Sequence, residues 1–176
     1  PTPLPPSSAA SDVYKRQMDN LTNSIDQVVQ ENVLPHEWPK EVLAELKNLE
    51  VKNNKRADLR KIPFVTIDGK DAKDFDDAVF CEFSKDGFDL QVAIADVAEI
   101  VKQDSSIDKE ALLRGTSIYF PKRVIPMLPE EISNNLCSLI PSEDRNVLVC
   151  KINYSKEGEI NSYEFSEAVI NSHKRF

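Results

Sequence analysis

The segment Thr66-Ile67-Asp68-Gly69-Lys70-Asp71-Ala72-Lys73-Asp74-Phe75-Asp76-Asp77-Ala78-Val79 places five aspartates within ten residues, between two apolar, strand-like runs. Two carboxylates about 4 Å apart repel each other by about 4 kcal/mol at an effective dielectric constant of 20. A cluster of this kind beside an apolar core must bind protons, pair with bases or bind a hard cation. Lys70 and Lys73 offset only part of the charge. Mg²⁺, which prefers oxygen ligands, is the natural candidate.

The acidic segment has two other interpretations, a solvated loop and a calcium-binding loop. Composition alone favours a solvated acidic loop. A calcium loop of the EF-hand type can be tested by its spacing. Counting from Asp74, the sixth position is Val79 where the motif needs glycine, and the twelfth is Lys85 where it needs glutamate. The segment is therefore not an EF-hand.

Composition limits the remaining possibilities. A chain of 176 residues that is 40% hydrophobic can bury one ordinary core, which indicates one domain or part of one. The net charge of −8, taken alone, argues against nucleic-acid binding, because phosphate contacts need Lys and Arg. No stretch is long and apolar enough to span a membrane, so no membrane partner is expected. Cys81, Cys137 and Cys150 are odd in number and widely spaced, which favours buried, reduced thiols in a cytoplasmic protein.

The pattern of residues predicts an α+β fold: a largely antiparallel sheet built from hairpins with flanking helices, preceded by a short helical lead-in. Residues 1–17 are rich in Pro, Ser and Ala and are interpreted as a disordered or non-native leader. Residues 18–61 are interpreted as the helical lead-in and linker. This region is expected to contain one helix near residues 24–29 and a second after Pro39. Trp38, beside the second helix, is interpreted as a packing residue, with base stacking as the alternative.

Two hairpins and one helix are predicted further along the chain. Asp86-Gly87 is a strong turn signal that would pair residues 79–83 with 88–94, where large apolar and mostly smaller or polar residues alternate as in a half-buried strand. Glu157-Gly158 would join a strand around residues 148–154 to one at 163–170. The run 105–114 reads as a helix ended by Gly115. Residues 119–141 are long and Pro-rich for a loop, which suggests a functional segment.

Several motifs occur in the order known from one family. The chain resembles the ribonuclease II and ribonuclease R exoribonucleases, with residues 62–176 matching the N-terminal half of their catalytic RNB domain. The motifs that carry the resemblance are Ile67-Asp68-Gly69, Asp74-Phe75-Asp76-Asp77-Ala78-Val79, Val92-Ala93-Ile94-Ala95-Asp96-Val97, Gly115-Thr116-Ser117-Ile118-Tyr119-Phe120-Pro121, Val124-Ile125-Pro126-Met127-Leu128-Pro129, Ser133-Asn134, Leu136-Cys137-Ser138-Leu139 and Glu167-Ala168-Val169-Ile170 with Ser172-His173.

The resemblance implies processive 3′-to-5′ hydrolysis of single-stranded RNA to nucleoside 5′-monophosphates. The cofactor would be Mg²⁺, with Mn²⁺ as a possible substitute; DNA is not an expected substrate, and the full-length parent is expected to be a monomer. The family's catalytic, metal-holding aspartates match Asp68, Asp74, Asp76 and Asp77. Asp76 matches the one whose loss abolishes cleavage and keeps RNA binding, whereas Asp71 falls outside the set. In an extended segment Asp77 would point away from Asp74 and Asp76, so the segment must bend if all are to converge.

Other assignments follow from the same resemblance. Tyr119 matches the tyrosine that stacks on a base near the RNA 3′ end, with core packing as the alternative. Asp96 either supports the metal site or caps a turn, and the basic run 52–61 either contacts RNA or is a solvated linker. The family's catalytic arginine and a second aromatic clamp residue would lie beyond residue 176, so this piece alone is expected to be inactive. A non-catalytic RNA-binding or regulatory relative is the alternative function.

Overall fold

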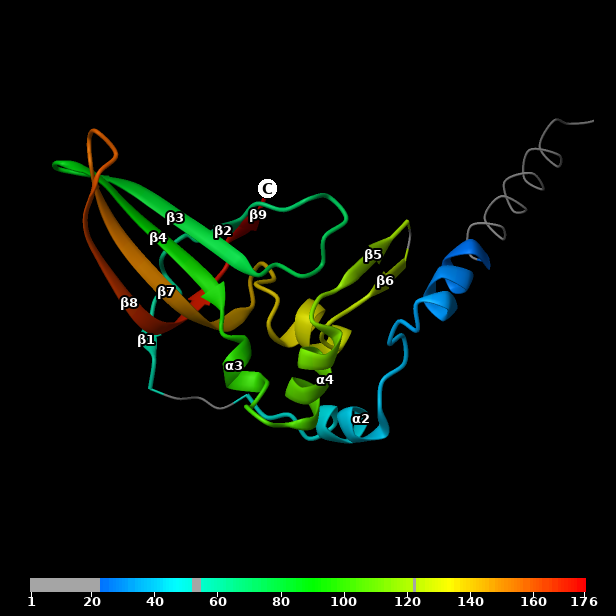
Figure 1. Ribbon diagram of the computed structural model, residues 1–176. Coiled ribbons are helices and arrows are strands. Elements are labelled where there is room, and N and C mark those ends of the chain that lie inside the picture. Colours follow the sequence, from blue (N-terminus) through cyan, green and yellow to red (C-terminus); the bar gives the residue numbers. More distant parts are fainter. Residues whose placement is uncertain (1–22, 52–54, 122) are drawn as a thin grey trace, which may run out of the picture.

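The computed structural model describes residues 23–51, 55–121 and 123–176, so the leader predicted at residues 1–17 lies outside the described residues. Within the described part, seven strands form one sheet in the order β1-β8-β7-β4-β3-β2-β9, and β5 and β6 form a separate hairpin (Figure 1). The elements are a helix at residues 23–31, α2 (Lys40–Leu46), β1 (Ala57–Asp58), β2 (Val65–Thr66), β3 (Asp77–Ser84), β4 (Gly87–Ala95), α3 (Val97–Ile100), α4 (Ser106–Arg114), β5 (Ile118–Phe120), β6 (Arg123–Ile125), a π-helical turn (Ile132–Leu136), β7 (Asp144–Ser155), β8 (Ile160–Asn171) and β9 (Lys174–Arg175).

The large sheet is built from the two predicted hairpins. β3 pairs with β4, β4 with β7 and β7 with β8, all antiparallel, which confirms the predicted fold class. Among the strands of the described residues, the two edge pairs are parallel: β1 joins β8, and β9 joins β2. The first hairpin turns one residue earlier than the sequence suggested, because Ser84 already pairs with Gly87 and leaves Lys85-Asp86 as the loop.

One face of the sheet packs onto the helices and forms the main core. Small residues cover this face: Ala78 on β3, Ala93 and Ala95 on β4, and Ala168 on β8 are all buried. Val147 and Val149 on β7 join them in one apolar cluster, to which α2 also contributes a buried residue, Val42. Residues of β4 alternate between the two faces, as the sequence indicated. The small residues face the core, because the segments packed on this side approach the sheet closely.

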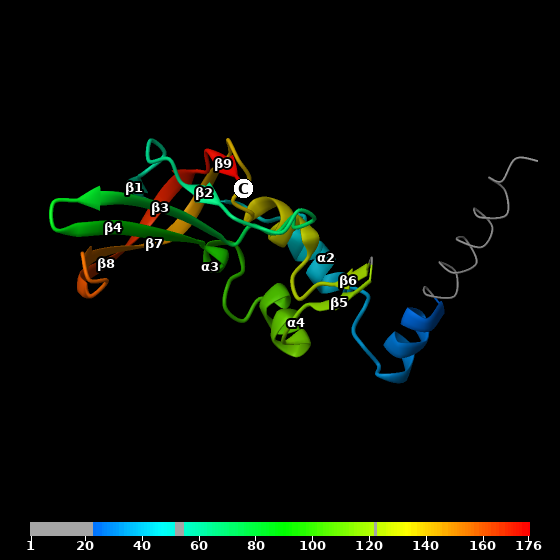
Figure 2. The same cartoon turned by 90° about the horizontal axis from the view of Figure 1, so that it is seen from above.

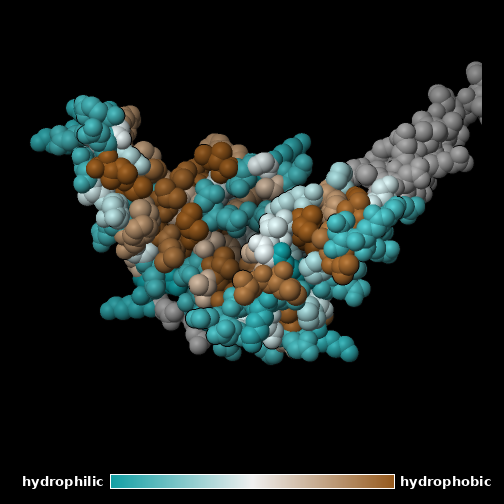
Figure 3. All heavy atoms as spheres, in the orientation of Figure 1, coloured by the Kyte–Doolittle hydropathy of each residue, from teal (hydrophilic) through white to brown (hydrophobic). Residues whose placement is uncertain are grey.

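The opposite face of the sheet carries larger apolar side chains that remain open to solvent. The row Asp77–Ile94–Leu148–Glu167 crosses four strands, and Ile94 and Leu148 are 47% and 48% exposed. Phe165 on β8 is 70% exposed on the same face. Figure 3 shows apolar surface gathered over these strands on the side turned to the viewer. Asp77 therefore lies at the end of an apolar, solvent-facing sheet surface.

The helices lie at one end of the sheet, as seen from above in Figure 2. Ser105 caps the N-terminus of α4, and its hydroxyl accepts a hydrogen bond from Asp108 N. Gly115, in the left-handed region (φ 71°), ends the helix as predicted. Trp38 packs against the main core, and the Arg114 guanidinium lies 3.6 Å from the centre of its ring. The interpretation of Trp38 as a packing residue is therefore confirmed. The β5–β6 hairpin, which the sequence analysis read as irregular chain, packs against the helix at residues 23–31.

The cysteines are all free, yet only Cys137 is buried; Cys150 is half-buried and Cys81 is exposed, which corrects the expectation of buried thiols. Cys81 is exposed because it lies on the open face of β3, in register with Leu90. In the described part of the chain, none of the helices has the length and apolar character needed to cross a membrane.

Gly87 is required by a close approach between strands. A Cβ atom built at this position would lie 1.9 Å from the backbone oxygen of Tyr154. We expect Gly87→Ala to push β4 and β7 apart and to lower the free energy of unfolding by at least about 2 kcal/mol, measured by urea denaturation. Gly69→Ala is the matched control, because nothing lies within 4 Å of a Cβ there. Equal stability of the two variants would contradict this reading of the β4–β7 contact.

Candidate metal and RNA site

The acidic segment forms the connection between β2 and β3, which leaves the sheet as a long loop (Figure 1). A turn at its start is closed by a hydrogen bond from Ala72 N to Gly69 O at 2.9 Å. This turn lies before the Asp74–Asp77 segment, where the sequence analysis required a bend; in the described chain residues 72–76 run without a turn, and Asp77 begins β3. Phe75 is buried in the main core and divides the loop into an Asp68–Asp74 arm and the Asp76-Asp77 pair that enters β3.

The C-terminal residues hold the first arm of the loop. Asp68 N donates to Phe176 O at 3.2 Å, and Phe176 N donates to Thr66 O at 2.9 Å, so β9 extends the ladder beside β2. Arg175 donates to the backbone oxygen of Gly69, and its guanidinium lies 4.8 Å from the centre of the Phe75 ring. Two residues far along the chain thus fix the backbone next to Asp68. Sequence reasoning gave Arg175 no role, and no spacing or motif signalled one.

The segment after the π-helical turn holds the loop around Asp74. Ser138 is fully buried; its hydroxyl accepts from Phe75 N at 3.0 Å and donates to Lys73 O at 2.8 Å. Leu139 N donates to Phe75 O at 2.9 Å. Both peptide groups that flank Asp74 are therefore anchored. The sequence analysis quoted the motif that contains Ser138, but it could not assign this contact, which spans 63 and 65 positions.

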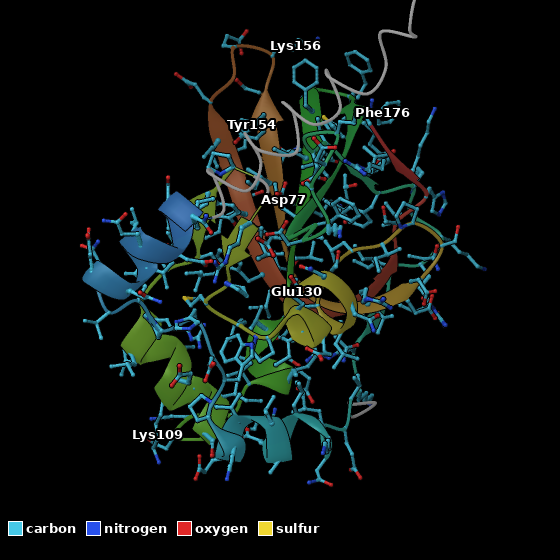
Figure 4. The ribbon with its side chains drawn as sticks, turned by 90° about the vertical axis from the view of Figure 1, so that its right-hand side faces the viewer. Asp77, Lys109, Glu130, Tyr154, Lys156 and Phe176 are labelled. Carbon is cyan, nitrogen blue, oxygen red and sulfur yellow. The ribbon has the colours of Figure 1, made fainter. Side chains whose placement is uncertain are left out.

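The four candidate carboxylates differ in their surroundings. Asp68 and Asp74 are half-buried, whereas Asp76 and Asp77 are exposed. One oxygen of Asp68, Oδ2, is buried without a hydrogen-bond partner. Although Asp76 is exposed as a residue, partial loss of hydration raises the pKa of its carboxyl, and the negative charges of Asp74, Asp77 and Asp68 raise it further. The loop therefore brings Asp74, Asp77 and Asp68 within electrostatic range of Asp76. Figure 4 shows Asp77 at the opposite end of the strands from Lys156, which lies at the far loop tip.

The donor set fits a divalent cation in its chemistry. Carboxylate oxygens are the ligands that Mg²⁺ prefers, and an orphaned buried oxygen such as Oδ2 of Asp68 is costly unless something satisfies it. However, among the described residues no three acidic, histidine or cysteine side chains surround one common point at binding distances. Asp76 and Asp77 are successive residues at the start of a strand, where side chains alternate between faces. Rotation of these side chains is required for them to share an ion.

Tyr119 lies on β5, directly opposite Val124 of β6. Its side chain is 69% exposed, which rules out the core-packing alternative. The hairpin that carries it is fixed by an ion pair of Arg123 with Asp26, 2.5 Å between Nη1 and Oδ1. The structure thus presents an aromatic ring to solvent on an anchored hairpin, as a base-stacking platform requires.

Two sequence interpretations need correction. The part of the basic run that the structure describes is neither free for RNA nor a solvated linker throughout. Arg56 is buried and donates to Asp96 at 2.6 Å and to Glu99 at 3.2 Å. Asp96 therefore serves as an ion-pair partner, and its side chain makes no helix-capping hydrogen bond. Arg60 pairs with Asp58 and with a residue of β7, Asp144. Its hydrogen bonds lower the pKa of Asp58, and the hydrogen bond from Asn171, followed by that from Arg60, lowers the pKa of Asp144. Residues 52–54 of the run lie outside the described part.

A bent, carboxylate-rich loop at the edge of an antiparallel sheet, with an exposed tyrosine on a neighbouring hairpin, defines a candidate site for metal-assisted chemistry on a nucleic acid. Comparison with known proteins agrees. The RNB domain model matches residues 56–176. A ribonuclease R of Vibrio parahaemolyticus is 54% identical over 148 residues, which cover 81% of this chain and 18% of that protein.

Solved structures of ribonuclease R from Mycoplasma genitalium show the same fold. The complex with ribose-methylated single-stranded RNA has a TM-score of 0.82 at 38% identity and covers 87% of this chain and 25% of that one. The complex with double-stranded RNA has a TM-score of 0.83 at 38% identity and covers 87% and 28%. The chain belongs to the RNB domain family. It spans only about a fifth of the length of the Vibrio relative.

The charge cluster predicts a measurable effect on stability. Because the pKa of Asp76 is raised in the fold, the stability that its protonated form contributes is complete below the unfolded value, about 3.8, and is lost as pH rises through the folded-state pKa. Asp76→Asn removes the repulsion. In EDTA at pH 7 we expect a gain of the order of 1 kcal/mol, or about 2–4 °C in Tm by calorimetry.

The same gain should shrink as the pH approaches 3.8, where wild-type Asp76 is itself neutral. Asp71→Asn is the matched control: it makes the same change in the same loop, at an exposed residue that does not contribute to the raised pKa of Asp76. A gain that is the same at pH 4 and pH 7, or that Asp71→Asn reproduces, would refute the electrostatic explanation.

Proposed function

We propose that the protein is a 3′-to-5′ exoribonuclease that hydrolyses single-stranded RNA to nucleoside 5′-monophosphates with Mg²⁺ as cofactor. The observation that carries this proposal is the loop that holds Asp68, Asp74, Asp76 and Asp77 within electrostatic range in an RNB domain. The proposal concerns the natural-length protein that contains this chain, because the relatives are several times longer.

In this proposal the four aspartates hold the divalent ions, and Mn²⁺ can substitute for Mg²⁺. When bound, such ions activate the attacking water and stabilise the charge on the leaving 3′-oxygen. Asp68 contributes from a backbone position fixed by Phe176, and Asp74 from one fixed between two anchored peptide groups. The anchored backbone keeps the ligands near their working positions, which lowers the entropy that must be lost on binding.

Tyr119 is proposed to stack on a base near the RNA 3′ end. A stacked base gains about 1–3 kcal/mol and makes no demand on sequence, which suits an exonuclease that must degrade any RNA. The ribonuclease R complexes of Mycoplasma genitalium contain RNA, and that likeness supports RNA as the partner here. Discrimination against DNA would come from contacts to the 2′-hydroxyl. The protein is proposed to act as a cytoplasmic monomer, for which the three free cysteines suit a reducing compartment.

The alternative is a non-catalytic RNA-binding relative. A protein that had lost catalysis would have no reason to retain four mutually repelling carboxylates on one anchored loop. Retention of all four therefore favours the enzyme, and the experiment below separates the two functions.

Asp76→Asn in the natural-length protein should reduce RNA degradation by at least about 10³-fold, because loss of a metal-holding carboxylate removes several kcal/mol of transition-state stabilisation. RNA affinity, measured by fluorescence anisotropy, should stay within about twofold. Mn²⁺ binding, followed by electron paramagnetic resonance, should be lost in the double variant Asp76→Asn with Asp77→Asn.

Asp71→Asn is the control for this experiment and should keep both activity and Mn²⁺ binding. Wild-type protein that binds RNA but neither degrades it nor binds Mn²⁺ would favour the non-catalytic alternative. An Asp76→Asn variant that digests RNA at the normal rate would remove Asp76 from the mechanism.

Tyr119→Ala should leave a longer limit product, by one or more nucleotides on a denaturing gel, because the last bases lose their stacking partner. Tyr119→Phe keeps the ring and should restore the wild-type product. Tyr163→Ala is the matched control, since Tyr163 is a similarly exposed tyrosine on β8. An unchanged product length in Tyr119→Ala would show that the ring contacts no base.

A further inference from the structure

Ser138 is a buried residue whose hydroxyl forms hydrogen bonds with the acidic loop. It follows the π-helical turn Ile132–Leu136 and is fully buried. Its hydroxyl bridges two backbone groups, donating to Lys73 O at 2.8 Å and accepting from Phe75 N at 3.0 Å. Asp74 is the residue between these two. One hydroxyl therefore fixes the backbone on both sides of a candidate metal-holding carboxylate.

Ser138 is itself held in place by its neighbours. Its backbone oxygen accepts from Arg145 Nε at 2.9 Å, so the β7 strand that carries Arg145 fixes the segment. The next residue, Leu139, is fully buried, and its N–H donates to Phe75 O at 2.9 Å. The Ser138 hydroxyl thus connects a rigid part of the sheet to the loop, and the Leu139 contact, which is made by backbone, would survive a change of the Ser138 side chain.

We propose that Ser138 is a positioning residue for the divalent-cation site, acting through the backbone of Asp74; this rests on the function proposed above. Without the hydroxyl, Lys73 O and Phe75 N lose their partner, and the peptide groups around Asp74 are free to rotate. The carboxylate of Asp74 then samples more orientations, and ion binding must restrict them. Residues that orient metal ligands without touching the metal typically contribute 10–100-fold to metal affinity.

The test is Mn²⁺ binding to the natural-length protein, measured by electron paramagnetic resonance without RNA. Ser138→Ala should weaken Mn²⁺ binding at least tenfold. The Mg²⁺ concentration for half-maximal RNA degradation should rise by a similar factor, while RNA affinity in EDTA stays within twofold. Ser138→Thr, which keeps the hydroxyl, should restore the Mn²⁺ affinity to within about threefold.

Ser172→Ala is the matched control. Ser172 is equally buried, but its hydroxyl has no hydrogen-bond partner, so the same atom is removed and no contact to the loop is lost. Its Mn²⁺ affinity should be that of the wild type. A role in folding alone would lower the amount of folded Ser138→Ala protein and its Tm without changing the Mn²⁺ affinity of the folded fraction, and that result would overturn the proposal.

A further variant covers the case in which Ser138→Ala does not fold. Ser138→Cys keeps a side chain of the same shape with a slightly larger, more weakly hydrogen-bonding group and should weaken Mn²⁺ binding at least threefold; unchanged affinity would overturn the proposal. Failure of the underlying function has a different signature, because Mn²⁺ binding would then be absent from the wild type or insensitive to Asp76→Asn with Asp77→Asn. Binding that needs Asp76 and Asp77 but not the Ser138 hydroxyl refutes only the positioning role.

Discussion

The mutual repulsion of four carboxylates on one loop is the main constraint on this structure, because the surrounding segments must hold the loop against it. Left to itself, an acidic loop of this kind would extend into solvent and separate its charges. Here the backbone is held instead. Phe75 is inserted into the main core. The C-terminal residues bond to the backbone at Asp68, and Ser138 with Leu139 bond to the backbone around Asp74. Loss of hydration raises the pKa of Asp76, and the charges of Asp74, Asp77 and Asp68, which the fold keeps near it, raise it further.

The same constraint explains why a chain with a net charge of −8 is compatible with RNA as a partner. Several arginines of the described chain neutralise charge within the protein. Arg56 is buried between Asp96 and Glu99, Arg60 bridges Asp58 to Asp144, and Arg114 pairs with Glu110. Net charge is therefore a poor guide to partners when acidic residues gather at one site and basic residues are used in internal ion pairs.

Sequence reasoning predicted the features that depend on local chemistry. The hairpins and the helix ended by Gly115 follow from turn residues and alternation. The features that it missed depend on contacts between distant segments. Alternation in β4 could not show that Ala93 and Ala95, rather than Val92 and Ile94, face the core, because that choice is made by how closely other segments pack on the sheet. The burial of Arg56 was hidden for the same reason, since Asp96 and Glu99 lie some 40 residues away in sequence.

The candidate site shows most clearly the difference between features set by local sequence and features set by contacts between distant segments. The aspartate spacing predicts the candidate ligands, but the groups that hold their backbone come from residues 138–139 and 175–176, more than 60 and more than 100 positions away. All of these contacts end on backbone atoms of the loop, and those of Leu139 and Phe176 are backbone to backbone, so they leave almost no side-chain pattern to read. Ser138 and Arg175 act on the loop through their side chains. The geometry of this candidate site depends on the folded sheet as well as on the acidic motif: the same fourteen residues without β9 and the Ser138 segment would retain the charge and lose the backbone contacts that hold the loop.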